Sequence, residues 1–132
     1  MEITILLDHN LDGYDLYLAA GLKEIGWDEL LLADFKRLRD YGLPDNLPDQ
    51  DIWRFVQAKR LLLITDNRNS RGETSLQATL GRENTPDALP ILTVADKEAL
   101  KRSDYRQRAA QKLVDIIIEL DCYLGTGRLF IP

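Results

Sequence analysis

The sequence of 132 residues is poor in cysteine and histidine, with one of each, and this scarcity excludes several kinds of site. The single cysteine, Cys122, cannot form an internal disulfide, so we expect a reducing, cytoplasmic environment. The single histidine, His9, has no cysteine partners at metal-ligand spacing, and a zinc site is therefore not predicted.

Long apolar runs and two common catalytic motifs are also missing. No run approaches the roughly 20 apolar residues that cross a bilayer. The N-terminal run 3–7 is short and lies between acids, so we expect neither a signal peptide nor a membrane partner. The sequence contains no Gly-rich phosphate loop and no G-x-S-x-G nucleophile elbow, which argues against serine-dependent acyl transfer.

Acidic residues outnumber basic ones, and the excess is concentrated near the N-terminus. The net charge is −5, and residues 1–52 alone hold 12 acids and 4 bases. This overall charge argues against a non-specific nucleic-acid binder. Residues 97–112 hold six bases against two acids. Such a pattern is typical of a nucleic-acid surface or of the solvated face of an amphipathic helix, and we favour the second interpretation.

Hydrophobic periodicity predicts strands that alternate with helices within a single domain of residues 1–132. The predicted strands are Ile3–Leu7, Leu30–Ala33, Leu61–Thr65, Ile91–Val94 and Arg128–Ile131. The predicted helices are Tyr14–Ile25, 48–58 and Asp104–Leu124, with a further helical stretch in the long connection 66–90. This alternation predicts an α/β fold with a small, mostly parallel sheet flanked by helices.

Three of these strands have an aspartate at or just past their end, namely Asp8, Asp66 and Asp96. In open parallel sheets, sites form in the crevice at the carboxyl ends of the strands. Carboxylates that converge there repel one another, and a bound cation relieves the repulsion. We select Asp8, Asp49 and Asp66 as candidate catalytic and metal-ligating residues, because carboxylate oxygens suit Mg²⁺ or Mn²⁺. The alternative is that these aspartates cap helices or form turns.

The segment that follows the predicted third strand is polar. Asn67 and Asn69, together with Asn10, are candidates to orient water or substrate, although asparagine is also common in turns. Arg68 and Arg71 are candidates to hold phosphate groups through forked hydrogen bonds, although loop arginines are often only solvated. We take these five residues as candidate substrate-binding residues.

Two segments, ILLDHNL and LPDQDIWRFVQAKRLLLITDNRN, resemble the PIN-like nuclease superfamily in its short bacterial form. The family pattern has a strand ending L-L-D-x-N, a helix beginning S-D-x-x-I and an apolar strand running into T-x-D. Asp8 and Asn10 match the first element, Asp49 matches the second and Thr65 matches the third. The similarity covers most of residues 3–70. It implies a three-layer fold and adds Thr65 to the candidate site.

The third element departs from the family pattern, which often reads T-R-D-K-D-F. In strict register, Asn67 and Asn69 stand where the family has aspartates, and Asp66 lies one position early. Asparagine is a weaker ligand for a hard cation than aspartate. Either Asp66 therefore substitutes from its shifted position, or the metal site is weakened.

The resemblance implies metal-dependent hydrolysis of phosphodiesters, with RNA as the substrate and Mg²⁺ or Mn²⁺ as the cofactor. By analogy with PIN-type toxins, it also implies a small antitoxin-like protein as a partner, and it leaves a homodimer open. Two alternatives remain. One is a PIN-like binding or regulatory module that has lost hydrolysis. The other is a receiver-like phosphoacceptor domain built on Asp8, Asp66 and Lys97, although the acid pair usual after the first strand of such domains is missing.

Overall fold

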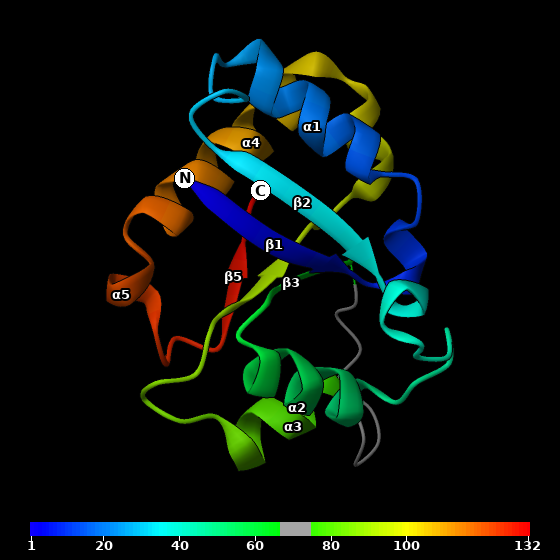
Figure 1. Ribbon diagram of the computed structural model, residues 1–132. Helices are drawn as coiled ribbons and strands as arrows, with labels where there is room; N and C mark the ends of the chain where they lie inside the picture. The colour runs from blue at the N-terminus through cyan, green and yellow to red at the C-terminus, as the bar shows by residue number, and fades with distance from the viewer. Residues whose placement is uncertain (67–74) are drawn as a thin grey trace.

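The computed structural model describes residues 1–66 and 75–132, which build one five-stranded sheet with helices around it (Figure 1). The strands are β1 (Glu2–Leu7), β2 (Leu32–Arg37), β3 (Leu62–Thr65), β4 (Ile91–Thr93) and β5 (Arg128–Phe130). Their order in the sheet is β2-β1-β3-β4-β5, and all four pairings are parallel. The predicted α/β fold class is therefore confirmed.

Helical segments connect successive strands, as parallel pairing requires. The α-helices are α1 (Asp15–Glu24), α2 (Asp49–Lys59), α3 (Leu76–Glu83), α4 (Ser103–Ile118) and α5 (Leu120–Tyr123). The 3₁₀ helices are η1 (His9–Leu11), η2 (Leu38–Tyr41) and η3 (Lys97–Lys101). In the described part of the chain, no helix combines the length and the apolar character needed to cross a membrane.

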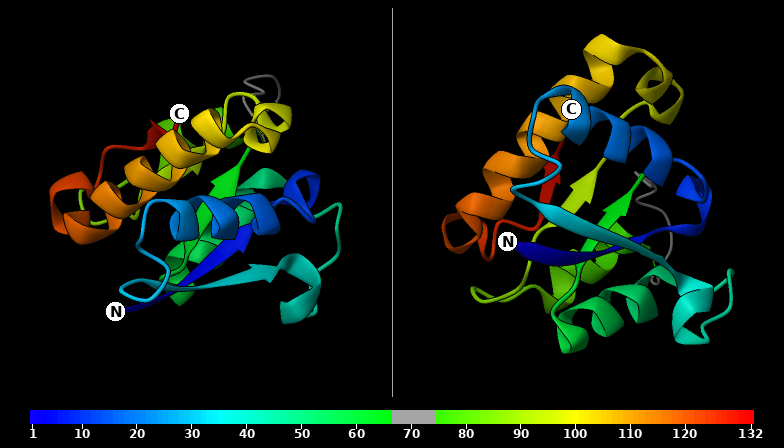
Figure 2. Two further views of the ribbon diagram at one scale, coloured as in Figure 1. Left: turned by 90° about the horizontal axis from the view of Figure 1, so that it is seen from above. Right: turned by 45° about the horizontal axis from the view of Figure 1, so that its top comes forward.

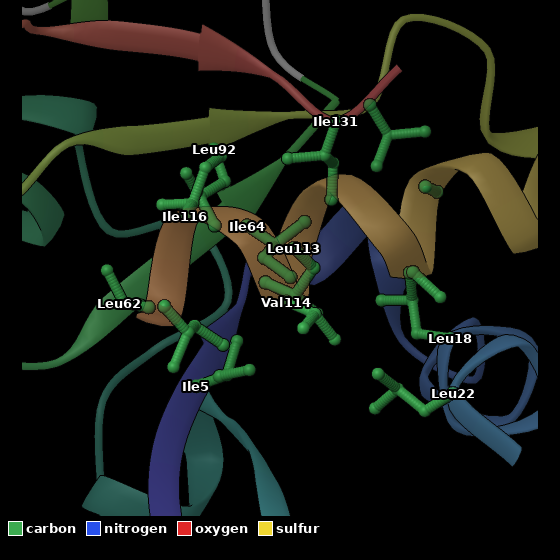
Figure 3. Close-up of a cluster of buried hydrophobic side chains, with 14 of the residues drawn as sticks. Ile5, Leu18, Leu22, Leu62, Ile64, Leu92, Leu113, Val114, Ile116 and Ile131 are labelled. Carbon is green, nitrogen blue, oxygen red and sulfur yellow. The ribbon is translucent and has the colours of Figure 1, made fainter. Parts of the chain in front are cut away.

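Helices α1 and α4 cover one face of the sheet (Figure 2). Ile5 of β1 and Ile64 of β3 point to this face, where they are fully buried with Leu18 of α1 and Leu113 of α4 (Figure 3). Gly21 allows the two helices to approach closely, because a Cβ placed there would lie 2.7 Å from the backbone oxygen of Arg106.

Helices α2 and α3 cover the opposite face, so the fold has three layers. Leu6 of β1 and Leu63 of β3 pack on this side against Ile52 and Val56 of α2 and Leu80 of α3. The central strands are thus buried on both faces. This double burial explains why β1, β3 and β4 appear in the sequence as apolar runs rather than as alternating patterns.

The direction in which the chain winds through the sheet reverses between β1 and β3. From β1 the chain passes to β2 on one side, and it then crosses to β3 on the other side. In doubly wound sheets, the crevice at the carboxyl ends of such a strand pair is the usual place for a ligand. The backbone N–H of Asp8 donates to the carbonyl of Ile64 (3.0 Å), which holds the ends of β1 and β3 side by side.

The second strand lies later in the sequence than the predicted range Leu30–Ala33. In β2, Ala33 and Phe35 pack against the core, whereas Asp34 is exposed on the alternate side. Because β2 is an edge strand with charged residues on one face, it contains no apolar run that would identify it.

The predicted helix Asp104–Leu124 is divided in two. Helix α4 ends at Ile118, and α5 begins at Leu120. Glu119, between them, has φ −110° and ψ 34°, which lies outside regular helix geometry. Three consecutive isoleucines, 116–118, precede this residue, and branching at Cβ lowers helix propensity at the point where the helix ends.

Candidate functional site

Asp8 follows β1 and lies at the junction with β3. Its Oδ1 accepts a hydrogen bond from the backbone N–H of His9 (2.7 Å), which caps η1. Its Oδ2 accepts a hydrogen bond from the hydroxyl of Thr65 (2.8 Å), a residue that is buried at the end of β3. These two hydrogen bonds fix the orientation of the Asp8 carboxylate between the two strands.

The pKa of Asp8 is raised above its ordinary value, chiefly because burial penalises the charged carboxylate. The hydrogen bonds from Thr65 and His9 lower it, and the negative charges of Asp49 and Asp66 raise it. The structure therefore places Asp49 and Asp66 near enough to Asp8 for their charges to act on its carboxylate. Because like charges repel, positive charge placed among them would stabilise the ionised forms.

Asp49 is the first residue of α2. Its Oδ2 accepts a hydrogen bond from the backbone N–H of Leu76 (3.2 Å), the first residue of α3. A negative charge in the first turn of a helix is stabilised by about 0.3–1 kcal/mol. Asp49 therefore has a structural role, because it joins α2 to α3. Its negative charge also acts on the carboxylate of Asp8.

Asp66 follows β3 directly, and its side chain is 19% exposed. One oxygen, Oδ2, lies 3.8 Å from the Nζ atom of Lys97. The other, Oδ1, is buried and has no hydrogen-bond partner within residues 1–66 and 75–132. A buried carboxylate oxygen without a partner is costly, so it marks a position where a hydrogen-bond donor or a cation would bind favourably.

Lys97 belongs to this site, although the sequence analysis placed it only in the receiver-like alternative. It begins η3, which follows β4, and its Nζ donates to the backbone oxygen of Asn10 (3.0 Å). Its Nζ also lies 5.5 Å from the centre of the Tyr14 ring. The lysine therefore links the segments that follow β1, β3 and β4. Lys97 could have been predicted as a site residue from the sequence, because it directly follows Asp96 at a predicted strand end.

The remaining candidates lie in different surroundings. Asn10 is exposed in η1 and contributes its backbone oxygen to Lys97. Asp96 is also exposed, and its carboxylate accepts a hydrogen bond from the backbone N–H of Ala99 (3.4 Å) as the cap of η3. The interpretation of Asp96 as a cap is therefore the one that its geometry supports. The candidates Asn67, Arg68, Asn69 and Arg71 lie outside the described residues.

The tightest potential metal-ligand group in the described ranges is a different one. One ligand atom from each of His9, Asp12 and Asp45 lies within 4.8 Å of the others, whereas Asp8, Asp49 and Asp66 do not form so tight a set. The group is partly exposed. Arg39 already supplies it with positive charge, since its Nη2 lies 3.6 Å from the Oδ2 of Asp12.

Comparison with protein-family models, with curated proteins and with solved structures found no match to this chain. The resemblance to PIN-like nucleases therefore stays a prediction that rests on the motifs themselves. The β1–β3 junction itself combines the carboxylates of Asp8 and Asp66 with a strand-end threonine and a bridging lysine.

Proposed function

We propose that this protein is a metal-dependent phosphodiesterase of the PIN-like type that acts on RNA and uses Mg²⁺ or Mn²⁺. The observation that carries the proposal is that Asp8 and Asp66 follow the adjacent strands β1 and β3, with the charge of Asp49, at the start of α2, acting on Asp8 as well. Their position at the reversal of the strand order, where doubly wound sheets bind ligands, supports it. An antitoxin-like protein partner is part of the same proposal, and it follows from the sequence resemblance alone.

The residues at the junction fit a hard divalent cation. All three candidate ligands are carboxylates, and Asp66 offers a buried oxygen that no described residue hydrogen-bonds. Mg²⁺ keeps several waters in protein sites, so the carboxylates need not approach one another as closely as three direct ligands would. Such an ion supplies an activated water and neutralises the charge that develops on the phosphodiester.

Thr65 and Lys97 have supporting roles in this proposal. The hydroxyl of Thr65 lowers the pKa of Asp8, which favours the ionised carboxylate that a cation requires. Lys97 lies 3.8 Å from Asp66, a position from which its ammonium group would hold a substrate phosphate beside the cation site. Asp66, which lies one position early in the motif, would then take the role of the family aspartate at whose position Asn67 stands.

Mn²⁺ titration and cleavage of single-stranded RNA test the proposal. Asp8→Asn and Asp66→Asn should each abolish cleavage and weaken Mn²⁺ binding by at least about tenfold, since each removes a charged ligand. Asp96→Asn is the matched control, because it removes the same charge from a strand-end aspartate that only caps η3. Wild-type protein that neither binds Mn²⁺ nor cleaves RNA would refute the proposal. It would also be refuted if Asp96→Asn lost as much Mn²⁺ binding and cleavage as Asp8→Asn and Asp66→Asn.

Asp49 needs a test of its own, because its carboxylate also holds the start of α3. Asp49→Asn should weaken Mn²⁺ binding, whereas Asp51→Asn should not. Asp51 lies two residues later on α2 and is paired with Arg54 (3.9 Å). The opposite result would show that the family motif has been aligned in the wrong register. Far-UV circular dichroism checks that both variants remain folded.

One contact favours a second candidate function, that of a receiver-like phosphoacceptor. Lys97 lies 3.8 Å from Asp66, so a strand-end aspartate has a cation beside it. The strand order is also the one found in flavodoxin-like domains. Incubation with acetyl phosphate and Mg²⁺ distinguishes the two functions. A phosphoryl group on Asp66, lost in Asp66→Asn, would replace the nuclease proposal, whereas absence of labelling would eliminate the receiver-like function.

A further inference from the structure

Strand β2 forms one edge of the sheet, and its outer side is open. The strand order ends at β2, whose described neighbour is β1, and the left view of Figure 2 shows β2 at the border of the molecule. None of its six residues is buried, and Leu32 is 51% exposed. An open edge strand presents backbone N–H and C=O groups that another strand can pair with.

The backbone groups that face outward follow from the pairing with β1. The N–H of Leu32 donates to the carbonyl of the N-terminal residue beside it (2.8 Å), so Leu32 faces β1. Because alternate residues of a strand direct these groups to opposite sides, Ala33 and Phe35 face away from β1. The N–H of Arg37 also faces outward, where it donates to the carboxylate of Asp40 (2.8 Å), and this bond marks the end of the open edge.

The charged side chains of β2 are ordered so that the strand complements itself. Asp34 and Lys36 lie on the same face, with Nζ 3.4 Å from Oδ2. In an antiparallel pair of two β2 strands centred on Phe35, Asp34 of each copy lies opposite Lys36 of the other. A shift of register by two residues, the smallest that keeps the outward-facing backbone groups paired, would place Asp34 opposite Asp34, or Lys36 opposite Lys36. Like charges directly opposite one another are destabilising, so charge selects the register centred on Phe35.

Hollows lie on both faces of the same strand. One, of about 510 Å³, is lined by residues of β1 and by Leu32, Ala33 and Asp34. Another, of about 200 Å³, lies on the α1 side and is lined in part by Leu32 and Phe35. Because successive side chains of a strand alternate between faces, a strand added at this edge would place side chains beside both hollows.

From this complementarity we propose that the β2 edge is a self-association surface. There, β2 of a second copy of the chain pairs with β2 of the first in antiparallel orientation. The two five-stranded sheets then form one continuous sheet, and the contact is isologous, which closes the assembly as a symmetric dimer. The proposal does not depend on the nuclease proposal, because none of the residues at the β1–β3 junction takes part in it.

Sedimentation equilibrium over a range of concentrations tests the proposal through a charge swap. Asp34→Lys and Lys36→Asp should each raise the dissociation constant of the dimer at least about tenfold, because each places like charges opposite one another twice. The double variant restores opposite charges and should restore the dimer. Asp121→Lys, on the exposed short helix α5, is the control for the change in net charge of Asp34→Lys, and Lys112→Asp, on the exposed face of α4, is the control for that of Lys36→Asp.

Hydrogen exchange provides a second measurement that needs no variant. Protection of the Ala33 and Phe35 amide protons should increase with protein concentration, because these are the N–H groups that face outward. A wild-type protein that stays monomeric at the highest soluble concentration would overturn the proposal. A dimer that both single variants leave intact would overturn it as well, as would a double variant that stays monomeric although its circular dichroism is native.

Discussion

Two glycines in helices provide a quantitative test of the packing between α1 and α4. Gly21 lies in α1, where an added Cβ would be 2.7 Å from the backbone oxygen of Arg106 and 3.1 Å from the Cβ of Ala110. Gly81 lies in α3, where an added Cβ would meet no atom within 4 Å among the described residues. Both positions are helical, so an alanine at either gains about the same intrinsic helix propensity, roughly 1 kcal/mol.

Only Gly21→Ala should meet a steric cost. A Cβ at 2.7 Å from a backbone oxygen forces α1 and α4 apart, and overpacking of this kind costs about 1–3 kcal/mol. Gly81→Ala should therefore raise the free energy of unfolding by about 0.5–1 kcal/mol, whereas the gain at Gly21 is cancelled or reversed. The propensity cancels in the difference between the two variants, which leaves about 1–3 kcal/mol for the helix contact alone.

Urea denaturation followed by far-UV circular dichroism measures this difference. The slope of the unfolding free energy with urea should be the same in both variants, since neither changes the surface exposed on unfolding. Two variants of equal stability would refute the reasoning, because α1 and α4 would then have room for a methyl group. Gly81→Ala that destabilises the protein would refute the assignment of an open helical position in α3.

The other predictions concern the junction of β1 and β3. Because the pKa of Asp8 is raised on folding, its ionisation costs stability as pH rises from 3.8 through the folded-state pKa. Asp8→Asn should therefore stabilise the protein at neutral pH, and urea denaturation at several pH values should show this gain vanish in acid; a gain independent of pH would contradict it. Lys97→Met should strengthen Mn²⁺ binding by about fivefold, the equivalent of ~1 kcal/mol for a partly exposed ion pair with Asp66. Lys101→Met, on the same 3₁₀ helix, should change the Mn²⁺ affinity little. Equal changes of Mn²⁺ affinity in the two variants, measured by isothermal titration calorimetry, would show that Lys97 does not compete directly with the cation for Asp66. Arg68→Ala should weaken RNA binding and reduce the salt dependence by about one unit, and filter binding at several salt concentrations measures both.

Much of the fold could be predicted from the sequence because burial on two faces leaves a clear pattern. The apolar runs that became β1, β3 and β4 were recognised for this reason, and so was the α/β alternation. Strand β2 was displaced in the prediction because its identity depends on its place at the sheet edge, which the local sequence does not encode. The last long helix is divided at Glu119, whose backbone angles leave the helical range, and hydrophobic periodicity alone does not reveal such a local break.

The candidate site was predicted in part. Asp8 and Asp66 could be selected because strand ends meet in a parallel sheet. Asp49 was selected with them as a further carboxylate, and the family resemblance then matched it to the second motif element. Lys97 entered only the receiver-like alternative, because its contact with Asp66, a residue 31 positions earlier in the chain, depends on β4 lying next to β3. A contact of this kind becomes visible only when the strand order is known.

The strand order also determines how the chain can assemble as it is synthesised. Strand β1 comes first and lies within the sheet, β2 adds on one side of it, and β3, β4 and β5 add in turn on the other. Every new strand therefore joins an edge that already exists, and none has to be inserted between two strands that have already paired. Growth of the sheet can follow the order in which residues leave the ribosome, with β5 closing the far edge last.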